Sequence, residues 1–129
     1  MGKPEKSLVI AGCLLLTAAA MLSAYGFHGL DDVLSPEKKA AWAWAVDMQY
    51  YHAIGLIILG VLSDRFGGAL LIRIAGVLMV AGIFIFSGLI YAEALGAPEA
   101  IGEIVPMGGT CFMVAWVLTA LNVFLHRAD

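Results

Sequence analysis

Apolar residues fill four separate stretches of this chain, and most charged residues lie in the segments between them. The pattern predicts helices over residues 8–27, 46–63, 70–95 and 106–125. Each stretch is long enough to cross the hydrocarbon core of a bilayer, which needs about 20 helical residues. We therefore expect an all-α protein, an integral membrane four-helix bundle, with one transmembrane domain over residues 1–129.

The second predicted span has a clear start signal in front of it. Ser35 precedes Pro36, which sets a capping residue before a proline at the first helical position. The first turns of this helix are amphipathic and carry Trp42 and Trp44, residues that favour membrane interfaces. We expect an amphipathic interfacial segment to precede the second span, with the spanning part beginning near Asp47.

Small residues and turn signals complete the predicted organisation. The alanines at 18–20 and the glycines Gly76, Gly82 and Gly88 would let helix backbones approach one another closely. The polar stretch 63–68 predicts a tight turn between the second and third spans. These small-residue faces are candidate contacts between helices, either within the bundle or with other proteins.

Composition narrows the class of protein. Hydrophobic residues make up 62% of the chain, and the mean hydropathy of +0.95 lies outside the range of water-soluble domains. The first apolar run, residues 8–24, is longer than the hydrophobic region of a signal peptide, which favours a retained span. With a net charge of −3 and seven dispersed Lys and Arg residues, a nucleic-acid partner is not expected.

The distribution of cations predicts the orientation in the membrane. The positive-inside rule places the richer side in the cytoplasm, so both termini are expected there. A bacterial inner (plasma) membrane is the expected location. The predicted cytoplasmic side has five cations: Lys3, Lys6, Arg65, Arg73 and Arg127. The opposite side has two, Lys38 and Lys39.

Several short motifs, taken together, resemble those of a known family. The chain is similar to the transmembrane-protein-256-like proteins, also called domain of unknown function 423. The resemblance covers nearly the whole chain and implies a small four-helix membrane protein with no established activity and no catalytic residues to carry over. The motifs are Gly26-Phe27-His28-Gly29-Leu30, Leu34-Ser35-Pro36, Gln49-Tyr50-Tyr51-His52-Ala53, Phe86-Ser87-Gly88 with Tyr91, and Pro106-Met107-Gly108-Gly109.

Polar residues near the predicted extracytoplasmic side form the candidate site. Polar groups inside membranes are costly and commonly mark a functional site or an interior contact. One interpretation is a shared pocket for a small ligand; the other is structural, with Gln49 and His52 bonding carbonyl groups beneath the 28–29 turn. No haem, other cofactor or metal site is expected, because no ligand spacing supports one. The candidates are His28, Asp31, Gln49, His52, Tyr91 and Glu93.

The sequence carries no motif of a known enzyme class, and no enzymatic activity is expected. The leading hypothesis is a structural, accessory or regulatory component of a membrane assembly, held in the lipid bilayer. It would associate with itself or with a larger complex through its glycine- and alanine-rich faces. The alternative is a homo-oligomeric ligand-binding or channel protein that uses the polar cluster.

Overall fold

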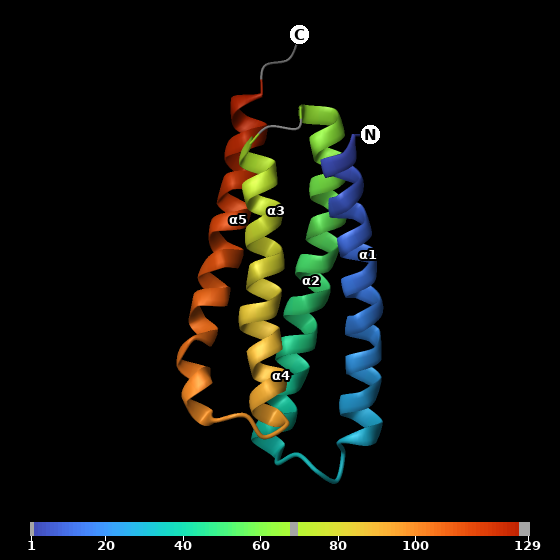
Figure 1. The fold of residues 1–129 in the computed structure, drawn as a ribbon, viewed down its shortest axis with the longest axis vertical. Coiled ribbons are helices and arrows are strands. Elements are labelled where there is room, and N and C mark those ends of the chain that lie inside the picture. Colours follow the sequence, from blue (N-terminus) through green and yellow to red (C-terminus); the bar gives the residue numbers. More distant parts are fainter. Residues whose placement is uncertain (1, 68–69, 127–129) are drawn as a thin grey trace.

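A computed structural model describes residues 2–67 and 70–126 and has four helical segments that are long and apolar enough to span a membrane (Figure 1). The first is α1, Lys3–Ala24, which continues as a π-helical turn over Tyr25–Gly29. A short loop leads to α2, Pro36–Phe66, the longest helix. The first span is thus longer at both ends than residues 8–27.

The third span is helical throughout but changes its winding. It consists of α3, Leu70–Gly82, a π-helical turn over Ile83–Gly88, and α4, Leu89–Ala94. A connection that includes a 3₁₀ helix, Glu99–Glu103, leads to α5, Val105–Leu125. The predicted third and fourth spans are confirmed within one residue at their ends, although a π-helical turn was not expected.

The expected start of α2 is confirmed, and its expected end is wrong. The Ser35 hydroxyl accepts a hydrogen bond from the backbone N–H of Lys38 at 3.3 Å, as an N-cap residue does. Residues 63–66 are helical rather than part of a turn, and the helix ends at Gly67, whose φ of +74° favours glycine. Gly68 of the predicted turn lies outside the described residues.

The segment predicted to precede the second span forms the first turns of α2, and the helix is continuous through Asp47, as expected for one helix that begins at Pro36. Trp42 in these turns is only 3% exposed, whereas Trp44 is 56% exposed. This segment therefore belongs to the packed bundle and extends it by about 15 Å at 1.5 Å per residue.

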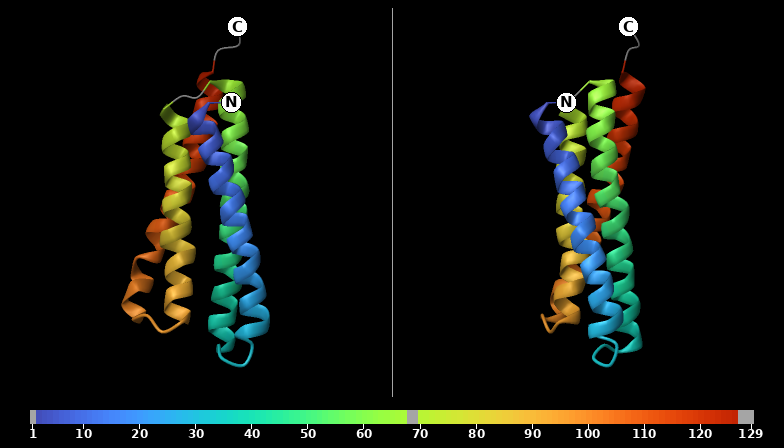
Figure 2. Two further views of the ribbon diagram at one scale, coloured as in Figure 1. Left: turned by 45° about the vertical axis from the view of Figure 1, so that its right-hand side comes forward. Right: turned by 90° about the vertical axis from the view of Figure 1, so that its right-hand side faces the viewer.

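The helices form two antiparallel hairpins that pack side by side. One hairpin is α1 with α2, and the other is α3 and α4 with α5 (Figures 1 and 2). We call the end that holds both termini and Gly67 the termini end, and the opposite end, with residues 30–35 and 95–104, the loop end. The ribbons of the two hairpins lie closer together at the termini end than at the loop end (Figure 2).

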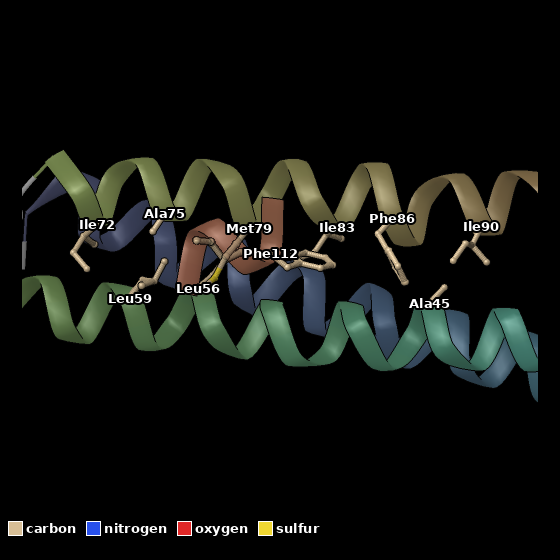
Figure 3. Packing of buried hydrophobic residues seen from close by; sticks show 11 residues of the cluster. Ala45, Leu56, Leu59, Ile72, Ala75, Met79, Ile83, Phe86, Ile90 and Phe112 are labelled. Atoms are coloured by element: carbon tan, nitrogen blue, oxygen red, sulfur yellow. The ribbon is translucent and has the colours of Figure 1, made fainter. Parts of the chain in front are cut away.

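Side chains of α2 and α3 face each other along the centre of the bundle (Figure 3). Leu56 and Leu59 of α2 and Ile72 and Met79 of α3 have no exposed surface. Glycines allow the helices to come close: a Cβ at Gly108 would lie 2.5 Å from the backbone nitrogen of Phe86, with other such positions at Gly12, Gly55, Gly60, Gly76 and Gly82. Several of these small residues are therefore used for helix contacts inside the bundle.

Candidate functional site

Gln49 lies at the centre of the bundle and links three helices. It is 2% exposed. Its Nε2 donates to the carbonyl oxygen of Leu15 in α1 at 2.9 Å, and its Oε1 accepts from the hydroxyl of Tyr91 in α4 at 2.8 Å. Because unpaired polar groups are costly in a membrane interior, these bonds fix how α1 and α4 pack on α2.

His52 lies one turn further along α2 but faces α5. Its Nδ1 is 2.7 Å from the carbonyl oxygen of Met48, and its Nε2 is 3.0 Å from Nε1 of Trp116. The indole N–H can only donate, so Nε2 accepts and Nδ1 carries the proton that is donated to Met48. The ring is stacked on Phe112 with centroids 3.6 Å apart. The neutral imidazole therefore has both nitrogens engaged and presents no free lone pair to a metal.

Trp42 connects α1 to α4 near the loop end. Its Nε1 donates to the carbonyl oxygen of Leu22 at 2.9 Å. The indole ring lies against Gly26, where any Cβ would overlap it, and its centroid is 4.7 Å from that of Tyr91. Tyr91 thus contacts both Trp42 and Gln49, and the aromatic and polar contacts of this region form one continuous set.

The interior contains further polar contacts that sequence reasoning did not find. Ser87, in the π-helical turn, donates to the carbonyl oxygen of Ala45 at 2.6 Å. Trp116, the partner of His52, was not among the candidates. Trp116 lies four residues after Phe112, which places both rings on one face of α5. This spacing is the sequence feature that could have indicated an aromatic contact face for His52. Chemically, these contacts bond one helix to the next.

The six predicted site residues do not line one cavity. Gln49 and Tyr91 are bonded to each other, and His52 is buried nearby but faces α5. The predicted bonds from Gln49 and His52 to carbonyl groups beneath the 28–29 turn are also absent, because both side chains bond to helical carbonyls farther inside. The other three, His28, Asp31 and Glu93, are separate from this network and from one another.

Those three residues lie at the loop end. His28 is exposed and contacts Phe27 edge to face. Asp31 forms an ion pair with Lys39 at 3.0 Å, with both side chains largely in contact with solvent. Glu93 is partly buried and lines a separate cavity of about 210 Å³ between α2 and α4, together with Glu37 and Lys38. The site that the sequence indicated is therefore divided between an interior network and the loop end.

A larger cavity of about 290 Å³ lies between α1 and α2 at the loop end. Its polar lining comes from Ser23, Asp31, Lys39 and Asp47, and the buried indole of Trp42 forms part of its wall. Lys39 of this lining pairs with Asp31, and the carboxylate of Asp47 has no ion-pair partner among residues 2–67 and 70–126. Asp47 is the most deeply placed charged residue in α2 that lacks such a partner.

A second polar contact joins α1 to α2 at the termini end. Glu5 is 9% exposed, and its Oε1 accepts a hydrogen bond from the Ser63 hydroxyl at 3.2 Å. Within the described residues no other partner reaches its Oε2. Among residues 2–67 and 70–126, no three His, Cys, Asp or Glu side chains come together as metal ligands would. The chemistry that these geometries support is hydrogen bonding between helices.

The chain folds into four apolar helical segments, arranged as two hairpins, and side-chain hydrogen bonds connect the helices in the interior. These features are those of a small multi-pass helical membrane protein. Residues 22–109 match the family described as "Protein of unknown function (DUF423)". The chain belongs to this family, and the resemblance noted from its motifs is confirmed.

Bacterial proteins described as UPF0382 membrane proteins are similar to this chain along nearly their whole length. The chain is 35% identical over 119 residues to the UPF0382 membrane protein SH2409 of Staphylococcus haemolyticus, which covers 92% of this chain and 96% of the relative. It is 34% identical over 113 residues to the UPF0382 membrane protein YwdK of Bacillus subtilis, which covers 88% and 92%. No solved structure matches the chain. The comparisons establish a membrane protein of unknown function and assign no site residues.

Proposed function

We propose that this protein is a non-enzymatic accessory component of a membrane assembly, and that it docks through the outward face of α2. The observation that carries the proposal is Asp47, an exposed carboxylate about 16 Å from the start of α2 at 1.5 Å per residue. On the same face of α2, Trp44 is 56% exposed and Tyr51 is 58% exposed. An ionised group within a span is costly when it faces lipid, and such groups generally pair with a partner.

The spacing of the outward face supports the same proposal. Its members recur at alternating intervals of three and four residues, the spacing of a helix that packs against another helix in a left-handed pair. They include apolar side chains that the bundle leaves between 41% and 58% exposed. The partner that fits this face is a transmembrane helix with an amide or basic side chain opposite Asp47. The face consists of Trp44, Asp47, Tyr51, Ile54, Ile58 and Val61.

The interior network favours an accessory role over an enzymatic one. A general base or nucleophile needs a free lone pair within reach of a substrate. In His52 both ring nitrogens are engaged, and in Gln49 the amide is bonded at both ends. These groups hold the helices in place, which suits a protein that acts by binding a partner through its outer surface.

The termini end is proposed to face the cytoplasm. Among the described residues it carries Lys3, Lys6, Arg65 and Arg73, whereas the loop end carries Lys38 and Lys39. The positive-inside rule assigns the richer end to the cytoplasm. Arg127, which the sequence argument also counted, lies outside the described residues. Labelling of single cysteines at Ser7 and Glu99 in intact cells tests this: only the Glu99 position should react with an impermeant reagent.

The docking face is tested by site-specific photo-crosslinking in the native host. A photoreactive residue at Ile54 should give one discrete adduct with a second protein, and the Asp47→Ala substitution should abolish it. A photoreactive residue at Leu14, exposed on α1, is the matched control and should give no such adduct. An adduct of twice the chain mass would indicate a homo-oligomer instead. An adduct that persists in Asp47→Ala, or equal products from both positions, would overturn the proposal.

A further inference from the structure

A second outward-facing feature is a groove between α1 and α3. It has a volume of about 470 Å³ and lies at the termini end. The two helices meet where Leu8 occupies the space beside Gly76, since a Cβ at Gly76 would overlap the Leu8 side chain. Ala11 and Val80 line the groove further along. Small side chains on both helices therefore leave a recess in a surface that faces lipid.

The groove suits a hydrocarbon chain. Its lining is almost entirely apolar, and on α3 it extends from Arg73 to Ala81, about 12 Å at 1.5 Å per residue. It opens on the outer side of two membrane-spanning helices, where the surrounding medium is lipid. A lipid acyl chain is therefore the occupant with both the required chemistry and direct access.

Arg73 gives the groove a charged rim. It is exposed in the first turn of α3, and no carboxylate in the described part of the chain forms an ion pair with it. A guanidinium group binds phosphate oxygens in a bidentate manner. Ser7 lines the groove at the same level, and Lys3 and Lys6 are exposed on α1 nearby. The rim is thus complementary to a headgroup with net negative charge.

We propose that the groove between α1 and α3 binds an anionic phospholipid, with Arg73 holding the phosphate and one acyl chain lying along Leu8, Ala11 and Val80. Cationic side chains near a membrane surface attract anionic lipids, and the depth of Arg73 allows it to reach the phosphate while its stem stays beside the apolar wall. This inference concerns a different face from α2 and does not depend on the proposed accessory role.

The test is a lipid titration of the delipidated full-length protein followed by native mass spectrometry. Phosphatidylglycerol and phosphatidylcholine with identical acyl chains are compared, so that only the headgroup charge differs. The wild type should retain one phosphatidylglycerol with an affinity at least about five-fold higher than for phosphatidylcholine, the factor expected of a single cation–lipid contact. Equal affinity for the two lipids would overturn the proposal.

Variants separate the groove from general surface charge. Arg73→Gln should remove the preference for phosphatidylglycerol, and Arg73→Lys should restore part of it. Arg65→Gln removes an exposed cation at the same end that does not line the groove and should behave as wild type. Ala81→Phe should block the groove and lower the affinity for both lipids. The proposal fails if Arg65→Gln weakens the preference as much as Arg73→Gln, or if Ala81→Phe leaves lipid binding unchanged while circular dichroism shows an intact fold.

Discussion

The hydroxyl of Tyr91 donates a hydrogen bond to Oε1 of Gln49 at 2.8 Å, across 42 residues of sequence. The same amide donates to the carbonyl oxygen of Leu15. Gln49 of α2 therefore bonds to α1 within its own hairpin and to α4 of the other hairpin. Because the amide has a donor end and an acceptor end, it can satisfy both contacts only in this orientation.

Tyr91→Phe should lower the free energy of unfolding by about 1 kcal/mol, the scale of interhelical hydrogen bonds in membrane proteins. The substitution leaves Oε1 of Gln49 without a donor in a buried position. Reversible unfolding in mixed micelles would measure the change. Tyr51→Phe, at a residue that is 58% exposed, is the matched control and should stay within about 0.5 kcal/mol of wild type. Equal losses in both variants would contradict the assigned role of the bond.

The two neighbouring tryptophans of α2 should respond differently to the same substitution. Trp42→Phe removes a donor to Leu22 and leaves space beside Gly26, so we expect a loss of about 1–3 kcal/mol of stability. Trp44→Phe changes a residue that is 56% exposed and should have little effect. Thermal unfolding followed by circular dichroism would test this. A larger loss for Trp44→Phe would mean that the interior position of Trp42 has been misassigned.

His52 should be neutral and protonated on Nδ1 at neutral pH. The donor Trp116 fixes Nε2 as an acceptor, and the carbonyl of Met48 accepts from Nδ1. Nitrogen-15 NMR of selectively labelled histidine distinguishes the two neutral tautomers directly. The Nδ1 proton should also exchange slowly with solvent, whereas the ring protons of exposed His28 should exchange fast. Observation of the Nε2–H tautomer at His52 would exclude the bond from Trp116.

Much of the fold could be predicted because it follows from local patterns. Four apolar runs of sufficient length predict four spans, and Ser35 before Pro36 predicts the start of α2. The polar residue Ser63 predicts a turn at that position, so the predicted end of α2 is too early. Ser63 is in fact buried, with its hydroxyl bonded to Glu5. A contact between residues 58 positions apart leaves no local signal.

The candidate site could be predicted only in part for the same reason. Gln49 and His52 stood out as polar residues in an apolar run, and both are interior residues. Both interpretations place them at one shared site, a pocket or the 28–29 turn. Neighbouring helices lie on both sides of α2, however, and one side chain bonds to α1 and α4 while the other bonds to α5. The directions were decided by helix packing, which a single sequence does not specify.

Two adjacent glycines in α5 offer a sharp test of the close packing between hairpin helices. A Cβ at Gly108 would lie 2.5 Å from the backbone nitrogen of Phe86, whereas the atom nearest to a Cβ at Gly109 is Cδ2 of the Phe86 ring, 4.0 Å away. In Gly108→Ala the contact is with backbone, which cannot move aside without shifting the π-helical turn, so we expect a loss of about 1–3 kcal/mol of stability. In Gly109→Ala the methyl group makes only an ordinary van der Waals contact, and the higher helix propensity of alanine should leave stability unchanged or raise it by up to about 1 kcal/mol. Because the two substitutions are chemically identical and adjacent in sequence, comparing their unfolding midpoints in the same micelle isolates the packing effect. Similar midpoints for the two variants would show that α5 does not approach the π-helical turn this closely in the membrane.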